Sequence, residues 1–126
     1  MMQRKRKYQP KTTRVNDEEI KADMENRTPK GWYGLSTPPG WWQIVRDLHL
    51  GIVEQCPDYE IFQIKEKFAE LRYYCSVEAD PSVSPLIEEA EQKCAKTCQV
   101  CGESGSIVTT RGWASIRCRN CLPDRK

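Results

Sequence analysis

Two closely spaced pairs of cysteines near the C-terminus constrain the fold more than any other feature of the chain. Cys98 and Cys101 form the first pair, Cys118 and Cys121 form the second, and 16 residues lie between the pairs. Each pair is short enough for both sulfurs to turn towards one point, so two pairs can surround one tetrahedral ion. Four thiolates most commonly hold Zn2+, and Gly102 tolerates the positive φ of a knuckle turn. The pattern therefore predicts one zinc site, with two disulfides or reduced core cysteines as the alternatives.

The predicted zinc has a structural role, because four cysteines leave no open position for water. Cys94 could replace Cys98 at a plausible spacing, but Cys94 fits the apolar stripe of a predicted helix. Cys56 and Cys75 are interpreted as small buried hydrophobic residues. A zinc deaminase would need a His-x-Glu motif, whereas the only histidine, His49, is followed by leucine and glycine. We interpret His49 as a surface or semi-buried side chain of a helix, and we expect no catalytic residues.

Length and composition limit the chain to one small domain, or to a small domain with an appended module. Of its 126 residues, 38% are hydrophobic, which leaves a thin core that a bound metal would help to stabilise. An odd number of cysteines with two tight pairs fits a reducing compartment. The basic N-terminus has no apolar segment behind it, so it is not a secretory signal, and no stretch approaches the about 18 apolar residues of a membrane span. We expect a cytoplasmic protein that does not contact membranes.

Charge is distributed unevenly along the chain. Residues 1–14 contain six basic residues and no acidic one, whereas the remainder has 14 basic and 18 acidic residues, a net charge of −4. We expect 1–14 to be a disordered basic arm, 15–97 a small α+β domain and 98–126 the zinc ribbon. The arm either contacts nucleic acid or an acidic protein surface, or is a solvated tail. The acidic remainder confines any attraction for phosphate to local patches.

Two main helices are expected. The first begins near Pro38 or Pro39, with Ser36 or Thr37 as its cap, and runs to about Glu54. Its apolar face consists of Trp41, Ile44, Val45, Leu48 and Ile52. The second runs from about 83 or 84 to 96, with a proline in its first turn, and leads directly to the first cysteine pair.

The segments around these helices are shorter or less regular. Asn16 is a capping residue followed by three acidic residues, which favours a short helix to about Asn26. Trp32, Tyr33 and Leu35 are expected to pack onto the domain, with an exposed recognition patch as the alternative. The segment 59–76 is ambiguous, because its apolar residues have helical spacing while Phe62 and Ile64 alternate with polar residues, as in a strand. Its pattern alone leans towards a helix.

A resemblance favours the strand interpretation. The matching residues are Gly40, Trp41, Ile44, Val45, Leu48, Pro57, Asp58, Tyr59, Gln63 to Phe68, Leu71 to Tyr74, Ala90, Glu91, Thr97, Cys98, Cys101 and Gly102. Over about residues 40–121 the chain resembles small, largely uncharacterised proteins of bacteria and their phages. These have a Lys-Glu-Lys-Phe-Gly-x-Leu-Arg-Phe-Tyr core and a cysteine-paired tail. Their glycine suits a turn between two strands, and Ala69 takes its place here. The resemblance implies a β-hairpin of 60–65 and 71–76 and supplies no activity.

Two groups of residues are candidates for binding. In the central motif, Lys65, Lys67, Arg72 and Tyr73 could grip phosphates and stack on bases. Neighbouring glutamates would repel a polyanion, however, and the alternative is a charged hairpin whose aromatic side chains form the core. In the ribbon, Arg111, Arg117 and Arg119 form a basic face. Trp113 beside them is expected to pack rather than to bind.

The sequence thus predicts an α+β fold with two main helices, a central β-hairpin and a C-terminal four-cysteine zinc ribbon. Because the resembling proteins include phage-borne ones, we expect a non-enzymatic accessory or inhibitor protein that binds a host macromolecular complex, without a small-molecule substrate. The alternative is a DNA- or RNA-binding protein that uses the basic arm and the ribbon arginines. An enzyme would require a pocket that gathers Glu66, Arg72 and His49.

Overall fold

The computed structural model describes residues 16–30 and 35–122 of the chain. Within these ranges it has the predicted α+β fold, with a central β-hairpin and a second small hairpin beside four clustered cysteines. The elements in chain order are α1 (Asp17–Asn26), the 3-10 helix η1 (Pro39–Trp41), α2 (Trp42–Gln55), β1 (Ile61–Lys67), β2 (Glu70–Cys75), α3 (Ser84–Cys94), β3 (Ser106–Thr110), β4 (Trp113–Arg117) and the 3-10 helix η2 (Arg119–Cys121). The expected arm at 1–14 and the expected packing of Trp32 and Tyr33 lie outside the described residues.

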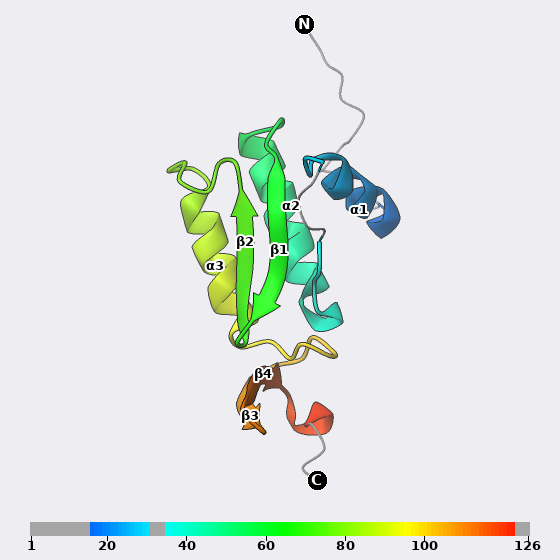
Figure 1. Cartoon of the computed structure of the whole chain (residues 1–126), viewed down its shortest axis with the longest axis vertical. Coiled ribbons are helices and arrows are strands. Elements are labelled where there is room, and N and C mark those ends of the chain that lie inside the picture. Colours follow the sequence, from blue (N-terminus) through cyan, green and yellow to red (C-terminus); the bar gives the residue numbers. More distant parts are fainter. Residues whose placement is uncertain (1–15, 31–34, 123–126) are drawn as a thin grey trace, which may run out of the picture.

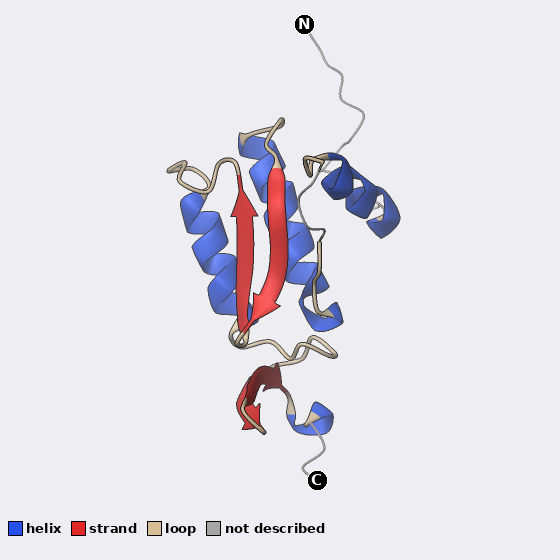
Figure 2. Cartoon of the chain, viewed as in Figure 1, coloured by secondary structure: helices blue, strands red, loops and turns tan. Residues whose placement is uncertain are grey.

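Helices and strands form two layers in the main body of the protein (Figure 1). β1 and β2 pair as an antiparallel hairpin, and α2 and α3 lie side by side on one face of it (Figure 2). The antiparallel β3–β4 hairpin lies beyond the end of the body where α3 finishes. No helix or strand of the described residues covers the opposite face of the β1–β2 hairpin.

The segment that was ambiguous in sequence forms a hairpin with a two-residue turn at Phe68 and Ala69. Both residues have positive φ, 52° and 69°, which is the backbone of a type I′ turn. Ala69 therefore takes up the left-handed conformation for which glycine is the usual residue, and its N–H donates to a carboxylate oxygen of Glu66 at 2.9 Å. The strands extend closer to the turn than the expected ranges 60–65 and 71–76. The helix interpretation of this segment is wrong.

The register of the hairpin decides which side chains are buried. Ile64 pairs with Tyr73, and both lie on the inner face against the helices, with Tyr73 only 3% exposed. Lys65 pairs with Arg72 on the outer face, because neighbouring residues of a strand point to opposite sides. The expected surface role of Tyr73 is therefore wrong. The alternative interpretation, in which the aromatic side chains of this segment form the core, is wrong for Phe68, which is 62% exposed at the turn.

The start of α2 differs from the predicted cap, whereas its buried face and the cap of α1 agree with the sequence pattern. Neither Ser36 nor Thr37 caps α2; the 3-10 turn η1 precedes it, and no side chain caps either element. The buried residues of η1 and α2 are Trp41, Val45, Leu48, His49, Ile52 and Val53. In α1, the side chain of Asn16 accepts from the N–H of Glu18 at 2.7 Å as predicted, and Ile20 and Met24 dock the helix on the core.

Candidate metal centre

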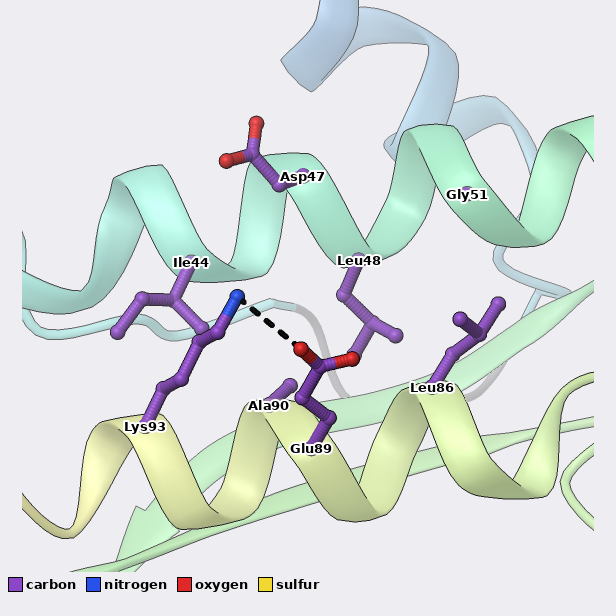
Figure 3. Close-up of a pocket in the computed structure, with 8 residues that line it drawn as sticks. All are labelled: Ile44, Asp47, Leu48, Gly51, Leu86, Glu89, Ala90 and Lys93. Carbon is purple, nitrogen blue, oxygen red and sulfur yellow. Dashed lines mark ion pairs between the residues drawn. The ribbon is translucent and has the colours of Figure 1, made fainter.

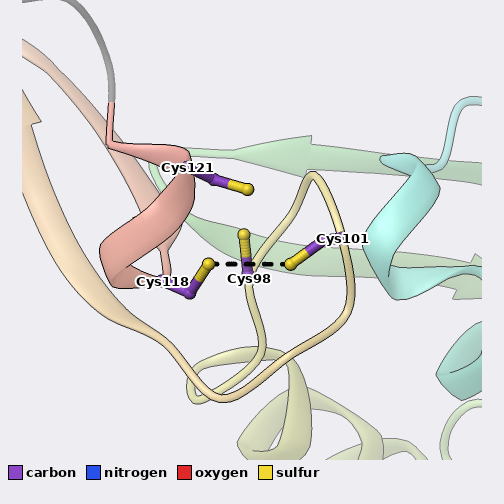
Figure 4. Close-up of side chains that lie close together, drawn as sticks. All are labelled: Cys98, Cys101, Cys118 and Cys121. Atoms are coloured by element: carbon purple, nitrogen blue, oxygen red, sulfur yellow. Dashed lines mark hydrogen bonds between the residues drawn. The ribbon is translucent and has the colours of Figure 1, made fainter.

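The structure brings the four cysteines of the two pairs together. The Sγ atoms of Cys98, Cys101, Cys118 and Cys121 all lie within 4.8 Å of one another (Figure 4). A tetrahedral ion with metal–sulfur bonds of about 2.3 Å separates its sulfurs by about 3.8 Å, and the Sγ atoms of Cys101 and Cys118 are 3.6 Å apart. This distance is far longer than the about 2.05 Å of a disulfide, and all four cysteines are free. The group can hold one metal ion.

Local backbone structure positions the first pair. Cys98 and Cys101 lie in the loop after α3, where the N–H of Val100 donates to the Cys98 sulfur at 3.4 Å. The N–H of Gly102 donates to the carbonyl of Cys98 at 3.1 Å. Gly102 has a φ of 87°, as predicted for the residue that closes the knuckle. The loop thus turns both sulfurs towards the second pair.

The second pair follows β4 and brackets a single turn of 3-10 helix. Cys118 immediately follows β4, and Cys121 is the last residue of η2. A guanidinium nitrogen of Arg117 donates to the carbonyl of Cys121 at 2.9 Å, which fixes the end of the turn. Cys98 is fully buried, whereas Cys101 is exposed, so the cluster lies near the surface.

Thiol electrostatics favour a cation at the centre of the cluster. Burial raises the pKa of Cys98, but hydrogen bonds from the backbone at Cys101, Cys118 and Val100 outweigh it and lower the pKa to about 6. The neighbouring thiol of Cys118 contributes most to raising the pKa of Cys121, to about 12. Crowded sulfurs cannot all ionise in the absence of a positive charge. A metal ion supplies that charge and takes the place of the thiol protons.

The cluster is joined to the helical body through η1. The N–H of Gly40 donates to the carbonyl of Gln99 at 2.7 Å, and the indole N–H of the fully buried Trp41 donates to the carbonyl of Thr97 at 2.8 Å. A Cβ atom on Gly40 would lie 2.7 Å from backbone atoms of both Gln99 and Gly102, and closer still to the carbonyl oxygen of Cys98. Only glycine permits this approach. In the sequence, this close approach is marked by a glycine that follows two prolines and precedes the helix.

The ribbon hairpin presents an aromatic side chain at its tip. Arg111 and Gly112 form its two-residue turn, with φ values of 53° and 84°. Trp113 pairs with Thr110 on one face of the hairpin, whereas Ile107 and the buried Ile116 lie on the other. Trp113 is 74% exposed, so its expected packing role is wrong. The sequence pattern does not distinguish the two faces, because both of them carry apolar residues.

The other predicted binding residues fall into two separate places. Lys65, Lys67 and Arg72 lie on the outer face of the β1–β2 hairpin, while Arg111 and Arg119 are exposed on the ribbon. The remaining cysteines lie away from the cluster. Cys75 and Cys94 are buried, burial raises their pKa values to about 11 and about 12, and Cys56 is half-buried.

His49 is fully buried at the centre of a polar network, so its interpretation as a surface or semi-buried side chain is wrong. One ring nitrogen, Nε2, donates to a carboxylate oxygen of Asp23 at 2.8 Å. Nδ1 of the neutral ring then accepts from the hydroxyl of Tyr59 at 2.6 Å, and the Tyr59 oxygen accepts from Tyr73 at 2.6 Å. Arg27 donates to the same Asp23 oxygen at 2.9 Å. The network joins α1 to α2 and to the hairpin.

This network predicts a loss of stability in acid. Burial lowers the pKa of His49 below 6.5, and the hydrogen bond to Asp23 only partly offsets this. Burial raises the pKa of the Asp23 carboxyl, but hydrogen bonds from His49 and Arg27 outweigh this effect and hold the pKa below 3.8. The folded protein thus binds fewer protons than the unfolded chain, so its stability is full above about pH 6.5 and falls as the pH drops.

Urea unfolding at pH 8, 6 and 5 measures this loss of stability. A second loss of stability is expected below pH 3.8, where aspartate is protonated in the unfolded chain while Asp23 of the folded protein still resists protonation. A His49→Gln variant should show a smaller fall between pH 8 and pH 5 than the wild type, and the part that comes from protonation of the metal-binding cysteines should remain. Stability that rises between pH 7 and pH 5 would contradict the neutral, buried state of His49.

The structure does not bring Glu66, Arg72 and His49 together, because Glu66 and Arg72 lie on opposite faces of the β1–β2 hairpin. A groove of about 110 Å3 lies between α2 and α3 (Figure 3). It is lined by Ile44, Asp47, Leu48, Gly51, Leu86, Glu89, Ala90 and Lys93. Lys93 and Glu89, one turn apart on α3, form an ion pair of 3.6 Å at one edge of the groove (Figure 3).

Comparisons with protein family models, with curated proteins and with solved structures give no match to the chain. The resemblance to bacterial and phage proteins therefore stays a hypothesis. In the part of the chain that the structure describes, no helix has the length and apolar character needed to cross a membrane.

Proposed function

We infer that the chain is a non-enzymatic binding module in which one structural Zn2+ holds the ribbon in place. Zn2+ is the ion most commonly bound by four cysteines in a closed shell, and the crowded sulfurs of the cluster suit its tetrahedral geometry. A site with four protein ligands offers no position for substrate or water, so the metal stabilises rather than reacts. A reducing cytoplasm would keep the thiolates available for the metal.

The partner that we propose is a protein, and the exposure of Trp113 carries this proposal. A tryptophan is among the residues that most often dominate the affinity of protein interfaces. Here it is 74% exposed on a hairpin whose other face is fixed by the buried Ile116. Binding costs such a residue little conformational entropy, because its strand is already ordered and its side chain has only two rotatable bonds. In keeping with the phage resemblance, we propose an accessory or inhibitor protein that binds a host macromolecular complex.

A Trp113→Ala variant tests this proposal. Tagged wild-type protein is expected to recover one protein partner in stoichiometric amount from a cell lysate, and the variant is expected to recover at least tenfold less. Ile107→Ala, on the opposite face of the same hairpin, is the matched control and should retain the partner. Zinc content and melting temperature should be unchanged in both variants. Equal recovery by Trp113→Ala would exclude the ribbon tip as the contact.

The alternative, nucleic-acid binding through the arm and the ribbon arginines, has less support on the ribbon. Arg117 is already engaged by the carbonyl of Cys121. A Zn2+ ion with four thiolates carries a net charge of −2, which the nearby arginines offset. The ribbon therefore offers a polyanion little net positive charge. The arm lies outside the described residues, and its role remains a proposal.

A further inference from the structure

We propose that the outer face of the β1–β2 hairpin is a binding surface for single-stranded nucleic acid. This surface consists of Gln63, Lys65, Lys67, Glu70, Arg72 and Tyr74, which the register places on the side away from the helices. It is separate from the ribbon tip and goes beyond the protein contact proposed above. We call it the outer face.

Two of the three cations on the outer face have no acidic side chain of the described residues against them. The third, Arg72, pairs with Glu70 at 3.0 Å and also interacts with Glu91 of α3, where Glu78 and Glu88 lie nearby. Among the described residues neither Lys65 nor Lys67 has an ion-pair partner. Lys65 and Arg72 are directly opposite each other across the hairpin. Like charges in this position destabilise a sheet, so a bound anion between them would relieve their repulsion.

The spacing of these cations suits an extended polyanion. Lys65 and Lys67 are two residues apart on one strand, so their Cα atoms are separated by about 6.6–6.8 Å. Successive phosphates of an extended single strand have a similar separation. A free two-stranded ribbon can enter the major groove of a duplex, but α2 and α3 cover the inner face of this hairpin (Figure 2) and leave only its outer face for contact. The outer face therefore favours a single strand.

Aromatic rings at the outer face provide stacking surfaces for bases. Tyr74 is 39% exposed and pairs with Gln63 across the hairpin. Phe68 projects from the turn at the end of the same strands, with the Lys67 ammonium 5.8 Å from its ring centroid. Phe68 holds this place despite a positive φ, where a bulky residue is unfavourable. Cationic groups that alternate with exposed rings are the usual surface for single-stranded nucleic acid.

A hollow beside Tyr74 indicates which bases are preferred. It has a volume of about 350 Å3 and lies between β2 and α3, where Arg72 and Tyr74 meet Glu78, Glu88 and Glu91. Carboxylates repel phosphate, but they accept hydrogen bonds from the exocyclic amino groups of bases. Cytosine, adenine and guanine have such a group, and thymine and uracil do not. The acidic hollow therefore favours a base with an amino group, such as cytosine, over thymine or uracil at the position that stacks on Tyr74.

Fluorescence anisotropy with labelled 12-mers tests the proposal on the full-length, metal-loaded protein. The probes are oligodeoxycytidine, oligothymidine, oligocytidine RNA and a DNA duplex of mixed sequence. We expect single strands to bind more tightly than the duplex and cytidine probes more tightly than oligothymidine. Affinity should fall with salt with a log–log slope of about −2, for three phosphate contacts on a single strand. Comparing the DNA and RNA cytidine probes shows which of the two the surface prefers.

Variants assign the binding to the outer face. Lys65→Gln/Lys67→Gln is expected to weaken binding at least tenfold and to reduce the salt slope by about 1.4, and Tyr74→Ser to weaken it about fivefold or more. The matched control, Lys21→Gln/Lys93→Gln, removes the same charge from α1 and α3 and should bind like the wild type. Melting temperature and zinc content verify that each variant is folded.

The outcomes that overturn the proposal are distinct from those that overturn the ribbon contact. Wild-type affinity in Lys65→Gln/Lys67→Gln, duplex binding as tight as single-strand binding, or affinity that is independent of salt would each exclude the outer face. Loss of oligonucleotide binding in Trp113→Ala would assign the nucleic acid to the ribbon instead. If Trp113→Ala loses its protein partner but binds cytidine probes normally, the two surfaces act separately.

Discussion

Removal of the metal is expected to unfold the ribbon and to lower the stability of the whole protein. The first cysteine loop shares hydrogen bonds with Gly40 and with the buried Trp41, so it cannot detach without exposing a core residue. Structural zinc contributes on the order of 10 kcal/mol in small domains, which is as large as the entire stability of many proteins. We expect one zinc per chain by elemental analysis. Circular dichroism should record a loss of secondary structure when a chelator is added.

A pair of cysteine variants tests the same expectation without a chelator. Cys118→Ser removes one ligand and should yield protein that lacks metal and is poorly folded. Cys56→Ser makes the same chemical change at a half-buried cysteine outside the cluster, and should keep one zinc and most of its stability. Full zinc content and an unchanged melting temperature in Cys118→Ser would show that the four-cysteine assignment is wrong.

The elements that depend on local pattern could be predicted from the sequence. Helical spacing of Val45, Leu48 and Ile52 located α2, and the positions of the cysteine pairs located the cluster of four sulfurs. Each pattern can be recognised within a short stretch of chain. Helical spacing recurs every three or four residues, and each cysteine pair spans four residues. For 59–76, the local pattern was misleading, because the spacing of the apolar residues in this segment favoured a helix whereas the structure has a hairpin. A resemblance was needed to favour the hairpin.

Features that depend on register or on distant partners could not be predicted. Whether Tyr73 or Tyr74 faces the core follows from a turn that starts at Phe68, and a shift of one residue would exchange them. The burial of His49 depends on Asp23, which lies 26 residues earlier in another helix. The exposure of Trp113 depends on which face of the ribbon packs against the body. None of these contacts leaves a periodic signal in the sequence.

Replacement of Gly40 is expected to be the most damaging change outside the cysteines. In Gly40→Ala the new methyl group would overlap the backbone of Cys98, Gln99 and Gly102, none of which can rotate away as a flexible side chain could. Either η1 or the cysteine loop must shift, and the hydrogen bonds of Gly40 and Trp41 to the loop would be lost. We expect a loss of about 3 kcal/mol or more in the free energy of unfolding, measured by urea denaturation.

Gly51→Ala separates the effect of contact from the effect of glycine itself. Gly51 lies inside α2, and a methyl group there would meet only a side-chain carbon of Leu86 at 3.5 Å, an ordinary contact. This variant should be more stable than the wild type by about 0.5–1 kcal/mol, because alanine favours a helix. Since Gly40 approaches the loop of Cys98 and Cys101, Gly40→Ala should also lower zinc affinity, whereas Gly51→Ala should not. Equal zinc affinity in Gly40→Ala and the wild type would show that the ribbon folds around its metal independently of η1.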